Sequence, residues 1–376
     1  LPSLTEMASS TAAESTAPFI DLPTALTQAQ AAGRSIHFLP PYRGDNKIRL
    51  HQWLKIGLDD LQAKSSTSLI KAVVDIAAIK SDAEIAEMVK AVNVTRLMHH
   101  TAMQRARPGM KEAELAGIIE GIALAHEGDV AYPVILSVNG QILHNHYHGN
   151  TLEEGQLVLV DAGADTAMHY AGDITRTFPV SQSFTSQQKE IYELVLKAEN
   201  ESISRSTVGT RNMDVHLFAS KVIASGLKDL GIMKGDVDEA VAAGAHALFF
   251  PHGLGHMIGL DVHDMEDLGE NYVGYGDELQ RSEQFGLRSL RLGRTLQAGF
   301  VLTVEPGIYF IPQLIDLWRS EGKFLDFINY NALDAYRNFG GIRIEDNVWI
   351  TDAGPMVLGD PIAKTVADVE ALRSGK

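Results

Sequence analysis

The chain contains no cysteine, and this absence excludes disulfide bonds, thiolate nucleophiles and cysteine-ligated zinc. Basic residues are also scarce. The sequence has 32 Lys and Arg against 48 Asp and Glu, which gives a formal net charge of −16. Phosphate backbones repel so acidic a chain, and we therefore expect no nucleic-acid partner. No apolar run approaches the roughly 20 residues that a membrane helix needs, so we expect no membrane association.

The first residues lack the features of a targeting segment. The stretch 1–6 has neither the basic start nor the long apolar core of a secretory signal peptide. We therefore expect a cytoplasmic protein. The chain does not begin with Met, which leaves open whether residue 1 is the true start.

The 376 residues suffice for one large domain or two ordinary ones. The hydrophobic pattern changes near residues 76–82, where we place a domain boundary. Before this point, residues 22–32 predict a short helix, and residues 35–39 predict a strand that ends at two prolines. We predict a partial α/β domain over residues 1–78 and a second domain over residues 79–376.

The second domain alternates between helical and strand patterns. Ser81 or Asp82 caps the first helix with Glu84 close behind, and Pro108-Gly109 ends it. The predicted helices are 81–107, 111–127, 185–205 and 213–231, and the predicted strands are 157–163, 170–178, 299–309 and 341–351. This order predicts an α+β domain with a mainly antiparallel sheet.

The histidines are clustered. Six of the 14 lie within residues 144–148 and 252–263. A lone histidine is usually a surface or core residue, but clustering beside glycines indicates a site. His252 and His256 have the spacing of a zinc-binding helix, but Gly253 and Gly255 each cost a helix about 1 kcal/mol. We therefore predict a loop or bent strand.

Carboxylates are attached to strands that are otherwise apolar. Asp161 follows four apolar residues, Asp173 alternates with threonines, Glu305 ends an apolar strand, and Glu345 alternates with isoleucines. Several buried carboxylates cannot all stay ionised close together without cations, and shared protons or divalent metals would solve this. Oxygen-rich sites with one or two histidines suit Mn²⁺, Co²⁺ or Zn²⁺.

Each of these signals has a simpler alternative when it is taken alone. Asp161-Ala-Gly can be an ordinary turn, Glu305-Pro-Gly can be an ordinary strand exit, and Arg343 can form a surface pair with Glu345. The combination is what favours a metal site.

Taken together, the motifs resemble a known family. They are Asp161-Ala-Gly, Tyr170-Ala-Gly-Asp173-Ile-Thr-Arg, His252-Gly-Leu-Gly-His256, Gly259-Leu-Asp-Val-His263-Asp, Val304-Glu305-Pro-Gly-Ile-Tyr309 and Gly341-Ile-Arg-Ile-Glu345-Asp. They resemble the pita-bread metallopeptidases, a family that contains aminopeptidase P, prolidase, methionine aminopeptidase and creatinase. The resemblance covers residues 80–370 and implies an α+β pita-bread catalytic domain.

The resemblance implies a dinuclear metal site. Asp161 would chelate one ion, Asp173 and Glu345 would bridge both, and His256 with Glu305 would complete the second site. We expect two divalent ions, with Mn²⁺ as the first choice and Zn²⁺ or Co²⁺ as alternatives. A hydroxide bridging the two ions would attack the scissile carbonyl.

The resemblance also implies residues that act on the substrate. His144, His252 and His263 would contact the developing oxyanion or the leaving nitrogen, and Glu305 would also move a proton. Tyr309 and Arg343 are expected in the substrate-binding set. His146 and His148 depart from the family pattern and stay unassigned, with a solvated loop as the simpler alternative.

Within the family, residues 286–297 and 310–343 resemble prolidase of the eukaryotic type. There the arginine that matches Arg291 binds the free carboxylate of an Xaa-Pro dipeptide, which suits the bidentate grip of a guanidinium. The alternative for Arg288 and Arg291 is a basic surface turn. We expect a prolidase, with an aminopeptidase P acting on longer Xaa-Pro peptides as the alternative and a non-catalytic binding protein as a remote one.

The family also bears on the N-terminal region and on assembly. Methionine aminopeptidase lacks a separate N-terminal domain and creatinase lacks the metal ligands, so both fit poorly. Residues 1–78 resemble only the second half of the N-terminal domain of prolidase-type members. That domain usually helps in dimerisation, and we expect a homodimer.

Overall fold

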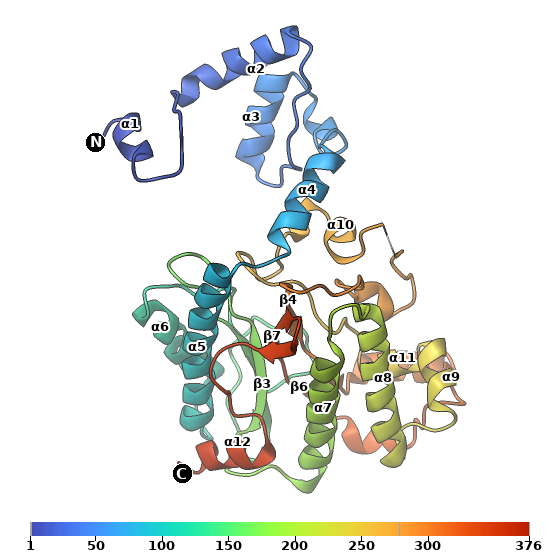
Figure 1. Cartoon of the computed structure of the whole chain (residues 1–376). Coiled ribbons are helices and arrows are strands. Elements are labelled where there is room, and N and C mark those ends of the chain that lie inside the picture. The colour runs from blue at the N-terminus through green and yellow to red at the C-terminus, as the bar shows by residue number, and fades with distance from the viewer. Residues whose placement is uncertain (1, 278, 376) are drawn as a thin grey trace. The chain divides into compact units, whose positions relative to one another are not determined.

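A computed structural model describes residues 2–277 and 279–375. The chain divides between Ile76 and Ala77 into two compact units. Each unit has its own secondary structure, and the units are described separately below (Figure 1).

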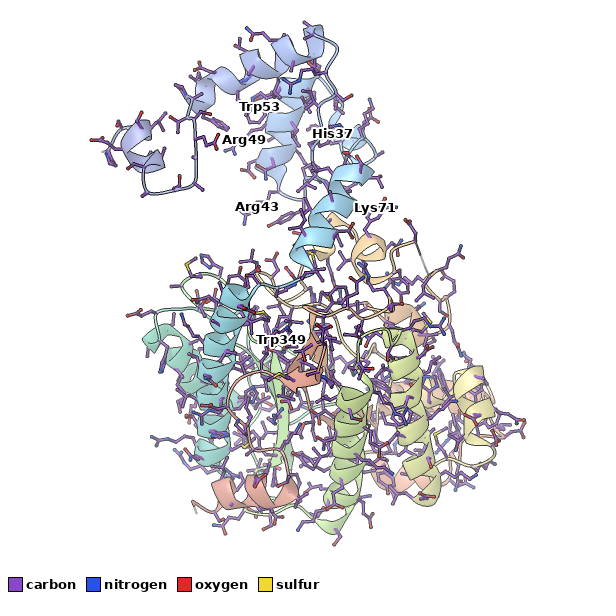
Figure 2. All side chains as sticks on the ribbon, viewed as in Figure 1. His37, Arg43, Arg49, Trp53, Lys71 and Trp349 are labelled. Atoms are coloured by element: carbon purple, nitrogen blue, oxygen red, sulfur yellow. The ribbon has the colours of Figure 1, made fainter. Side chains whose placement is uncertain are left out.

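The N-terminal unit is helical over its described residues. Its elements, with η for short 3-10 helices, are α1 (Leu4–Ala8), η1 (Phe19–Asp21), α2 (Leu22–Ala31), α3 (Gly44–Leu54), η2 (Leu58–Asp60) and α4 (Thr67–Ala77). The predicted helix over 22–32 is confirmed as α2. The ring of Phe19 meets that of Trp53 edge to face at 5.4 Å, and Arg49 lies over Phe19. Figure 2 shows Arg49 and Trp53, which both belong to α3.

The strand predicted over residues 35–39 is wrong. This segment is irregular, and the Phe38 carbonyl instead accepts a hydrogen bond from the Ser66 N–H at 2.9 Å. A strand needs a neighbouring strand to pair its backbone groups, and the described part of this unit contains none. The expected α/β character of residues 1–78 is therefore replaced by a helical arrangement.

The second unit contains all eight strands of the described chain, and every pairing is antiparallel. One sheet has the order β1-β2-β3, a second has the order β4-β7-β8, and β5 pairs with β6. The strands are β1 (Ile135–Ser137), β2 (Leu157–Ala162), β3 (Ile174–Pro179), β4 (Val301–Val304), β5 (Gly307–Tyr309), β6 (Gly341–Arg343), β7 (Asp346–Thr351) and β8 (Gly354–Val357). The predicted α+β class and antiparallel pairing are confirmed.

Helices surround these strands (Figure 1). They are α5 (Asp82–Arg105), α6 (Glu112–Ala125), α7 (Ser186–Arg205), α8 (Asn212–Asp229), α9 (Val237–Ala243), η3 (Ala245–Leu248), η4 (Glu266–Leu268), α10 (Glu270–Gly274), η5 (Leu287–Ser289), α11 (Pro312–Ser320), η6 (Ala332–Tyr336) and α12 (Val366–Arg373). The helix α5 begins with the predicted capping box of Ser81 and Glu84. It packs on α6, β2 and β3, while α7 packs on α8, β5 and β6.

An apolar core joins α5 to both sheets. It consists of Ile85, Met88, Val92, Ala171, Ile174, Ile258, Val301, Leu358 and Ile362. Trp349 of β7 packs against it (Figure 2). Because this core fixes α5 against the strands, the loops at the strand ends have a rigid base. Among the described residues, no helix has the length and apolarity needed to cross a membrane.

Candidate metal centre and active site

The first two carboxylates of the site lie on adjacent strands. Asp161 of β2 pairs with Thr175 of β3, and Asp173 lies just before β3. The side chain of Asn347 holds the Asp173 backbone, because its Oδ1 accepts from the Asp173 N–H at 3.0 Å and its Nδ2 donates to the Asp173 carbonyl at 2.6 Å. Both carboxylates are buried. Their backbones are therefore fixed before any ligand arrives.

The other two carboxylates lie where predicted strands break. The strand predicted over 299–309 divides into β4 and β5 at Glu305-Pro306, and that over 341–351 divides into β6 and β7 at Ile344-Glu345. Proline has no N–H for the ladder, so the pairing between these two segments is interrupted there. The Glu305 N–H donates to the Leu254 carbonyl at 2.8 Å, and the Glu345 N–H donates to the Thr175 carbonyl at 3.1 Å.

The segment that contains His256 is irregular, as predicted. A Cβ at Gly255 would lie 1.9 Å from the Thr303 carbonyl oxygen, so only glycine fits this close approach. The Nδ1 of His256 lies 3.0 Å from the Met257 carbonyl, which can only accept, so Nδ1 carries the proton. Its Nε2 faces Asp173 at 3.4 Å. In the neutral ring, this nitrogen presents a lone pair to the carboxylates.

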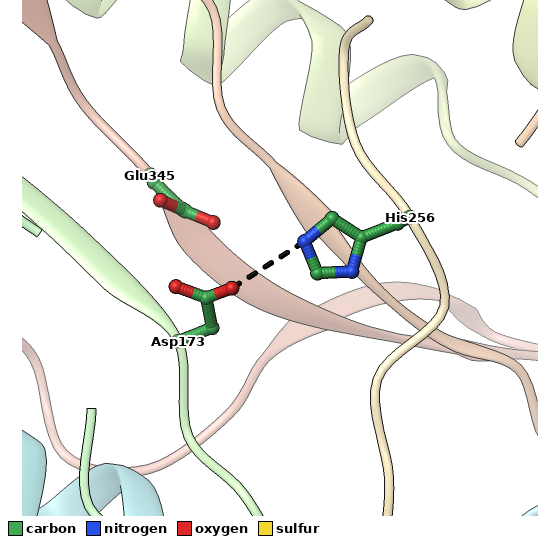
Figure 3. A group of neighbouring side chains, drawn as sticks. All are labelled: Asp173, His256 and Glu345. Carbon is green, nitrogen blue, oxygen red and sulfur yellow. Dashed lines mark ion pairs between the residues drawn. The ribbon is translucent and has the colours of Figure 1, made fainter. Parts of the chain in front are cut away.

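Asp173, His256 and Glu345 form the centre of the site (Figure 3). One ligand atom from each of them lies within 4.8 Å of the others. Asp161 and Glu305 flank this group: Asp161 pairs with Arg343, and Glu305 Oε1 lies 3.8 Å from His256 Nε2. All five predicted ligands line one cavity of about 740 Å³.

The site carries more negative charge than its protein partners neutralise. Burial raises the pKa of Glu345 well above its usual range, raises that of Glu305 to about 7 and raises that of Asp161. Burial also acts on Asp173, but its hydrogen bond to His256 outweighs this and the pKa of Asp173 is lowered. The same contact outweighs burial at His256 and raises its pKa to about 9.

These pKa shifts indicate that the site lacks positive charge. Four carboxylates, of which Asp161, Asp173 and Glu345 are buried and Glu305 is partly exposed, meet two groups that can be cationic, Arg343 and His256. Without a further cation, the site must hold protons on carboxylates and on His256. Divalent ions can replace these protons, and the mixture of oxygens with one imidazole is a donor set that such ions accept. The residues therefore fit a divalent metal centre.

The predicted substrate residues lie around the same cavity. His144, His252, His263, Arg291 and Arg343 line it. The ring centroid of His263 is 4.3 Å from that of His256, and partial burial together with the nearby His256 and Arg291 lowers the pKa of His263. These residues therefore line the same cavity as the carboxylates, Arg343 from β6 and the others from outside the strands.

Tyr309 does not line the cavity but holds two residues that do. Its hydroxyl lies 2.8 Å from His252 Nε2 and 3.1 Å from Arg343 Nη1. The Nδ1 of His252 lies 2.8 Å from the Gly253 carbonyl and must donate to it, so the neutral Nε2 accepts from the hydroxyl. Burial lowers the pKa of His252 to about 3, which keeps this ring neutral.

The segment 144–148 contributes in different ways. His144 lines the cavity with a backbone φ of 54°, a left-handed conformation that is uncommon outside glycine. The unassigned His146 also lines the cavity. The unassigned His148 instead places Nε2 3.0 Å from the Val134 carbonyl.

Three supporting residues were not predicted. The Tyr132 hydroxyl lies 2.6 Å from Asp161 Oδ1 and 2.5 Å from Asp173 Oδ1, so one proton is shared between two carboxylates. Thr175 donates to Glu345 Oε2 at 2.6 Å, and Asn347 holds Asp173 as described. Thr175 and Asn347 each lie two residues from a predicted ligand, and this spacing could have revealed them. No pattern in the sequence indicated Tyr132.

Comparison with known proteins agrees with this geometry. A profile of metallopeptidase family M24 matches residues 86–352. The chain is 35% identical over 319 residues to the human Xaa-Pro dipeptidase and 38% identical over 310 residues to a probable Xaa-Pro aminopeptidase, PEPP, of Fusarium vanettenii. These matches cover 83% and 80% of this chain, and the chain spans 63% of the length of each relative.

Solved structures are also similar. The structure of Pseudomonas aeruginosa aminopeptidase PepP is 30% identical with a TM-score of 0.78, and the match covers 99% of this chain and 78% of that chain. Aminopeptidase P from E. coli with the inhibitor Pro-Leu is 36% identical with a TM-score of 0.67, and the match covers 81% of this chain and 62% of that chain.

Proposed function

Because the chain belongs to metallopeptidase family M24, we propose that it hydrolyses peptide bonds between any residue and proline, with Xaa-Pro dipeptides as its preferred substrates. The observation that carries the proposal is the single cavity lined by the four carboxylates, His256 and the neutral histidines. The printed names of the relatives, Xaa-Pro dipeptidase and Xaa-Pro aminopeptidase, support the bond that is cleaved.

The cavity would hold two divalent ions. Asp161 would bind one ion, Asp173 and Glu345 would bridge both, and His256 with Glu305 would complete the second site. When bound, such ions supply an acidified water as nucleophile and a Lewis acid for the carbonyl. We propose Mn²⁺ as the native ion, with Zn²⁺ or Co²⁺ as alternatives.

The remaining residues of the cavity would move protons and orient the peptide. Glu305 is proposed to accept a proton and then return it, in addition to binding the second ion. His252 and His263 are neutral and can hydrogen-bond the oxyanion or the leaving nitrogen. His144, on its strained backbone, is proposed for the same task.

A dedicated site suits the Xaa-Pro bond for a physical reason. The proline nitrogen carries no N–H and the ring fixes φ, so peptidases that bind an extended backbone lose a hydrogen-bond donor. Positioning must then come from the free amino end, the carbonyl and the carboxylate of the substrate.

The preference for dipeptides is proposed from Arg291. Arg291 lines the cavity, its side chain is 35% exposed, and its guanidinium can bind a carboxylate with two charge-assisted bonds. A dipeptide places its carboxylate one residue closer to the cleaved bond than a tripeptide, a difference of about 3.3–3.6 Å in an extended chain. The alternative, an aminopeptidase P, requires equal or better cleavage of longer peptides.

The test compares Ala-Pro, Ala-Pro-Ala and Ala-Ala with Mn²⁺-loaded protein. We expect cleavage of Ala-Pro above Ala-Pro-Ala and none of Ala-Ala. Arg291→Ala should lower kcat/KM for Ala-Pro about ten- to a hundredfold, and Arg291→Lys should recover only part. Arg288→Ala is the matched control, because Arg288 does not line the main cavity.

Two outcomes would change the proposal. Equal cleavage of the tripeptide and of longer peptides would identify an aminopeptidase P with the same metal chemistry. No cleavage of any Xaa-Pro peptide by metal-loaded protein would favour a non-catalytic binding protein. The homodimer and the cytoplasmic location remain predictions, which gel filtration and cell fractionation would test.

A further inference from the structure

Arg291 is tied to an acidic residue outside the cavity lining. Its Nη1 donates to Glu266 Oε2, and the same oxygen lies 3.7 Å from His263 Nδ1. The Glu266 side chain is 16% exposed and does not line the cavity that holds the carboxylates. The Glu266 carboxylate, which lies outside the cavity lining, therefore contacts both Arg291 and His263, and these two residues are proposed to touch the substrate.

The residues that precede Glu266, the first residue of η4, are held in place by buried contacts. Asp264 forms an ion pair with Lys80 at 2.7 Å, and both side chains are buried. The Asp264 N–H donates to the Met257 carbonyl at 3.0 Å, and a Cβ at Gly259 would lie 2.6 Å from Asp264 Oδ2. Met265 is buried with a left-handed φ of 64°, a strained conformation for a side-chain residue. Glu266 is thus fixed rather than a mobile surface acid.

Arg291 lies at the junction of two cavities. It lines the main cavity and also a second one of about 480 Å³, as does Ser289. The arginine side chain is long and flexible, so without a partner its guanidinium could turn from the first cavity toward the second. The ion pair with Glu266 determines on which side the guanidinium stays.

We propose that Glu266 is the positioning residue that makes this enzyme prefer dipeptides over longer Xaa-Pro peptides, by holding Arg291 at the carboxylate of the dipeptide. Glu266 occupies Nη1, which leaves Nη2 and Nε for the two oxygens of the substrate carboxylate. When Arg291 is released, the second cavity can accept the residue that follows proline. This proposal rests on the proposed function.

The test measures the ratio of kcat/KM for Ala-Pro to that for Ala-Pro-Ala in wild type and in Glu266→Gln. Gln keeps the size of the side chain but loses the charge-assisted bond, so KM for Ala-Pro should rise about tenfold with kcat nearly unchanged. Cleavage of Ala-Pro-Ala should stay the same or improve, so the ratio should fall about tenfold. A merely structural defect would lower kcat/KM for both substrates alike and leave their ratio unchanged.

Glu370→Gln is the matched control. Glu370 pairs with Lys189 at 3.0 Å and lines neither cavity, so the same change there should leave the ratio within about twofold. In an Arg291→Ala background, Glu266→Gln should change the ratio no further, because its effect passes through Arg291. Glu266→Asp keeps the charge on a shorter side chain and should lose part of the ratio, and it decides the matter if the Gln variant does not fold.

The outcomes separate this inference from the proposed function. An unchanged ratio in Glu266→Gln, or an equal drop in the Arg291→Ala background, would overturn the positioning role while hydrolysis by the wild type upholds the proposed function. Absence of Xaa-Pro hydrolysis by the wild type would overturn both.

Discussion

Two buried charge clusters lie on opposite sides of one short chain segment, and only one of them is balanced. Glu345 belongs to the cavity cluster, where four carboxylates meet Arg343 and His256. The next residue, Asp346, points into a second cluster with Arg176, Lys364 and Glu199.

In the second cluster, which we call the balanced cluster, every charged side chain has a partner of opposite charge. Asp346 lies 2.6 Å from Arg176 and 2.7 Å from Lys364, and Lys364 lies 2.8 Å from Glu199. Burial disfavours the charge on Asp346, but Arg176 and Lys364 outweigh it and lower the pKa of Asp346 to about 2. Burial beside Asp346 raises the pKa of Glu199 to about 8, although the contact with Lys364 favours its ionised form.

The contrast distinguishes a structural cluster from a binding site. A buried network that contains its own cations needs no ligand, whereas the cavity cluster must take up protons or metal ions. The two clusters also cooperate, because Arg176 Nη1 donates to the Glu345 carbonyl at 2.6 Å. Arg176 of the balanced cluster thereby holds the backbone of Glu345, which belongs to the cavity cluster.

The largest effect is expected from removing a bridging carboxylate of the cavity. Asp173→Asn or Glu345→Ala should reduce turnover to less than about a thousandth and lower the metal content, because each takes a donor from both proposed ions. The measurements are kcat with added Mn²⁺ and elemental analysis of the protein. Either variant keeping more than about a tenth of wild-type turnover would contradict the dinuclear assignment.

Breaking the balanced cluster should act mainly on stability. Asp346→Asn leaves the buried Arg176 and the half-buried Lys364 short of one partner and should lower the free energy of unfolding by about 3–5 kcal/mol. The measurement is denaturant unfolding of metal-free protein. Asp334→Asn, which loses a surface pair with Arg319, is the control and should cost no more than about 1 kcal/mol. Equal losses would mean that the Asp346 cluster is not a stabilising network.

A smaller effect separates ligands from proton donors within the cavity. His252→Ala and His263→Ala should lower kcat about a hundredfold with the metal content unchanged, because both rings are proposed to act on substrate. His144→Ala should behave in the same way. His256→Ala should lose metal, and metal loss in His263→Ala as large as in His256→Ala would show that these roles are assigned wrongly.

The smallest effect concerns pH and the balanced cluster. Glu199 has a folded pKa of about 8, above its ordinary 4.5, so its contribution to stability is complete below the ordinary value and is lost as pH rises through the folded value. Glu199→Gln has no proton to lose there. The Tm of metal-free wild type should therefore fall by several degrees relative to Glu199→Gln between about pH 5 and 8.5. Parallel Tm profiles would contradict the raised pKa.

Much of the second unit could be predicted because its signals are local. The capping box at Ser81 and Glu84, the helical periodicity of α5 and the apolar runs of β2 and β3 each depend on neighbouring residues. The strand over 35–39 failed for the opposite reason. Its composition suits a strand, but a strand also needs a partner, and pairing is not a local property.

The order of residues along the chain sets the chemical types at the site and the elements that carry them, because it places particular side chains at strand ends and beside glycines. The balance of charge at the site depends instead on how the chain folds. Glu345 and Asp346 are adjacent acids with the same local pattern, yet one faces surplus carboxylates and the other faces Arg176 and Lys364. The partners come from segments far apart in the chain, and Coulomb interactions between them depend on distance in space rather than on separation in sequence.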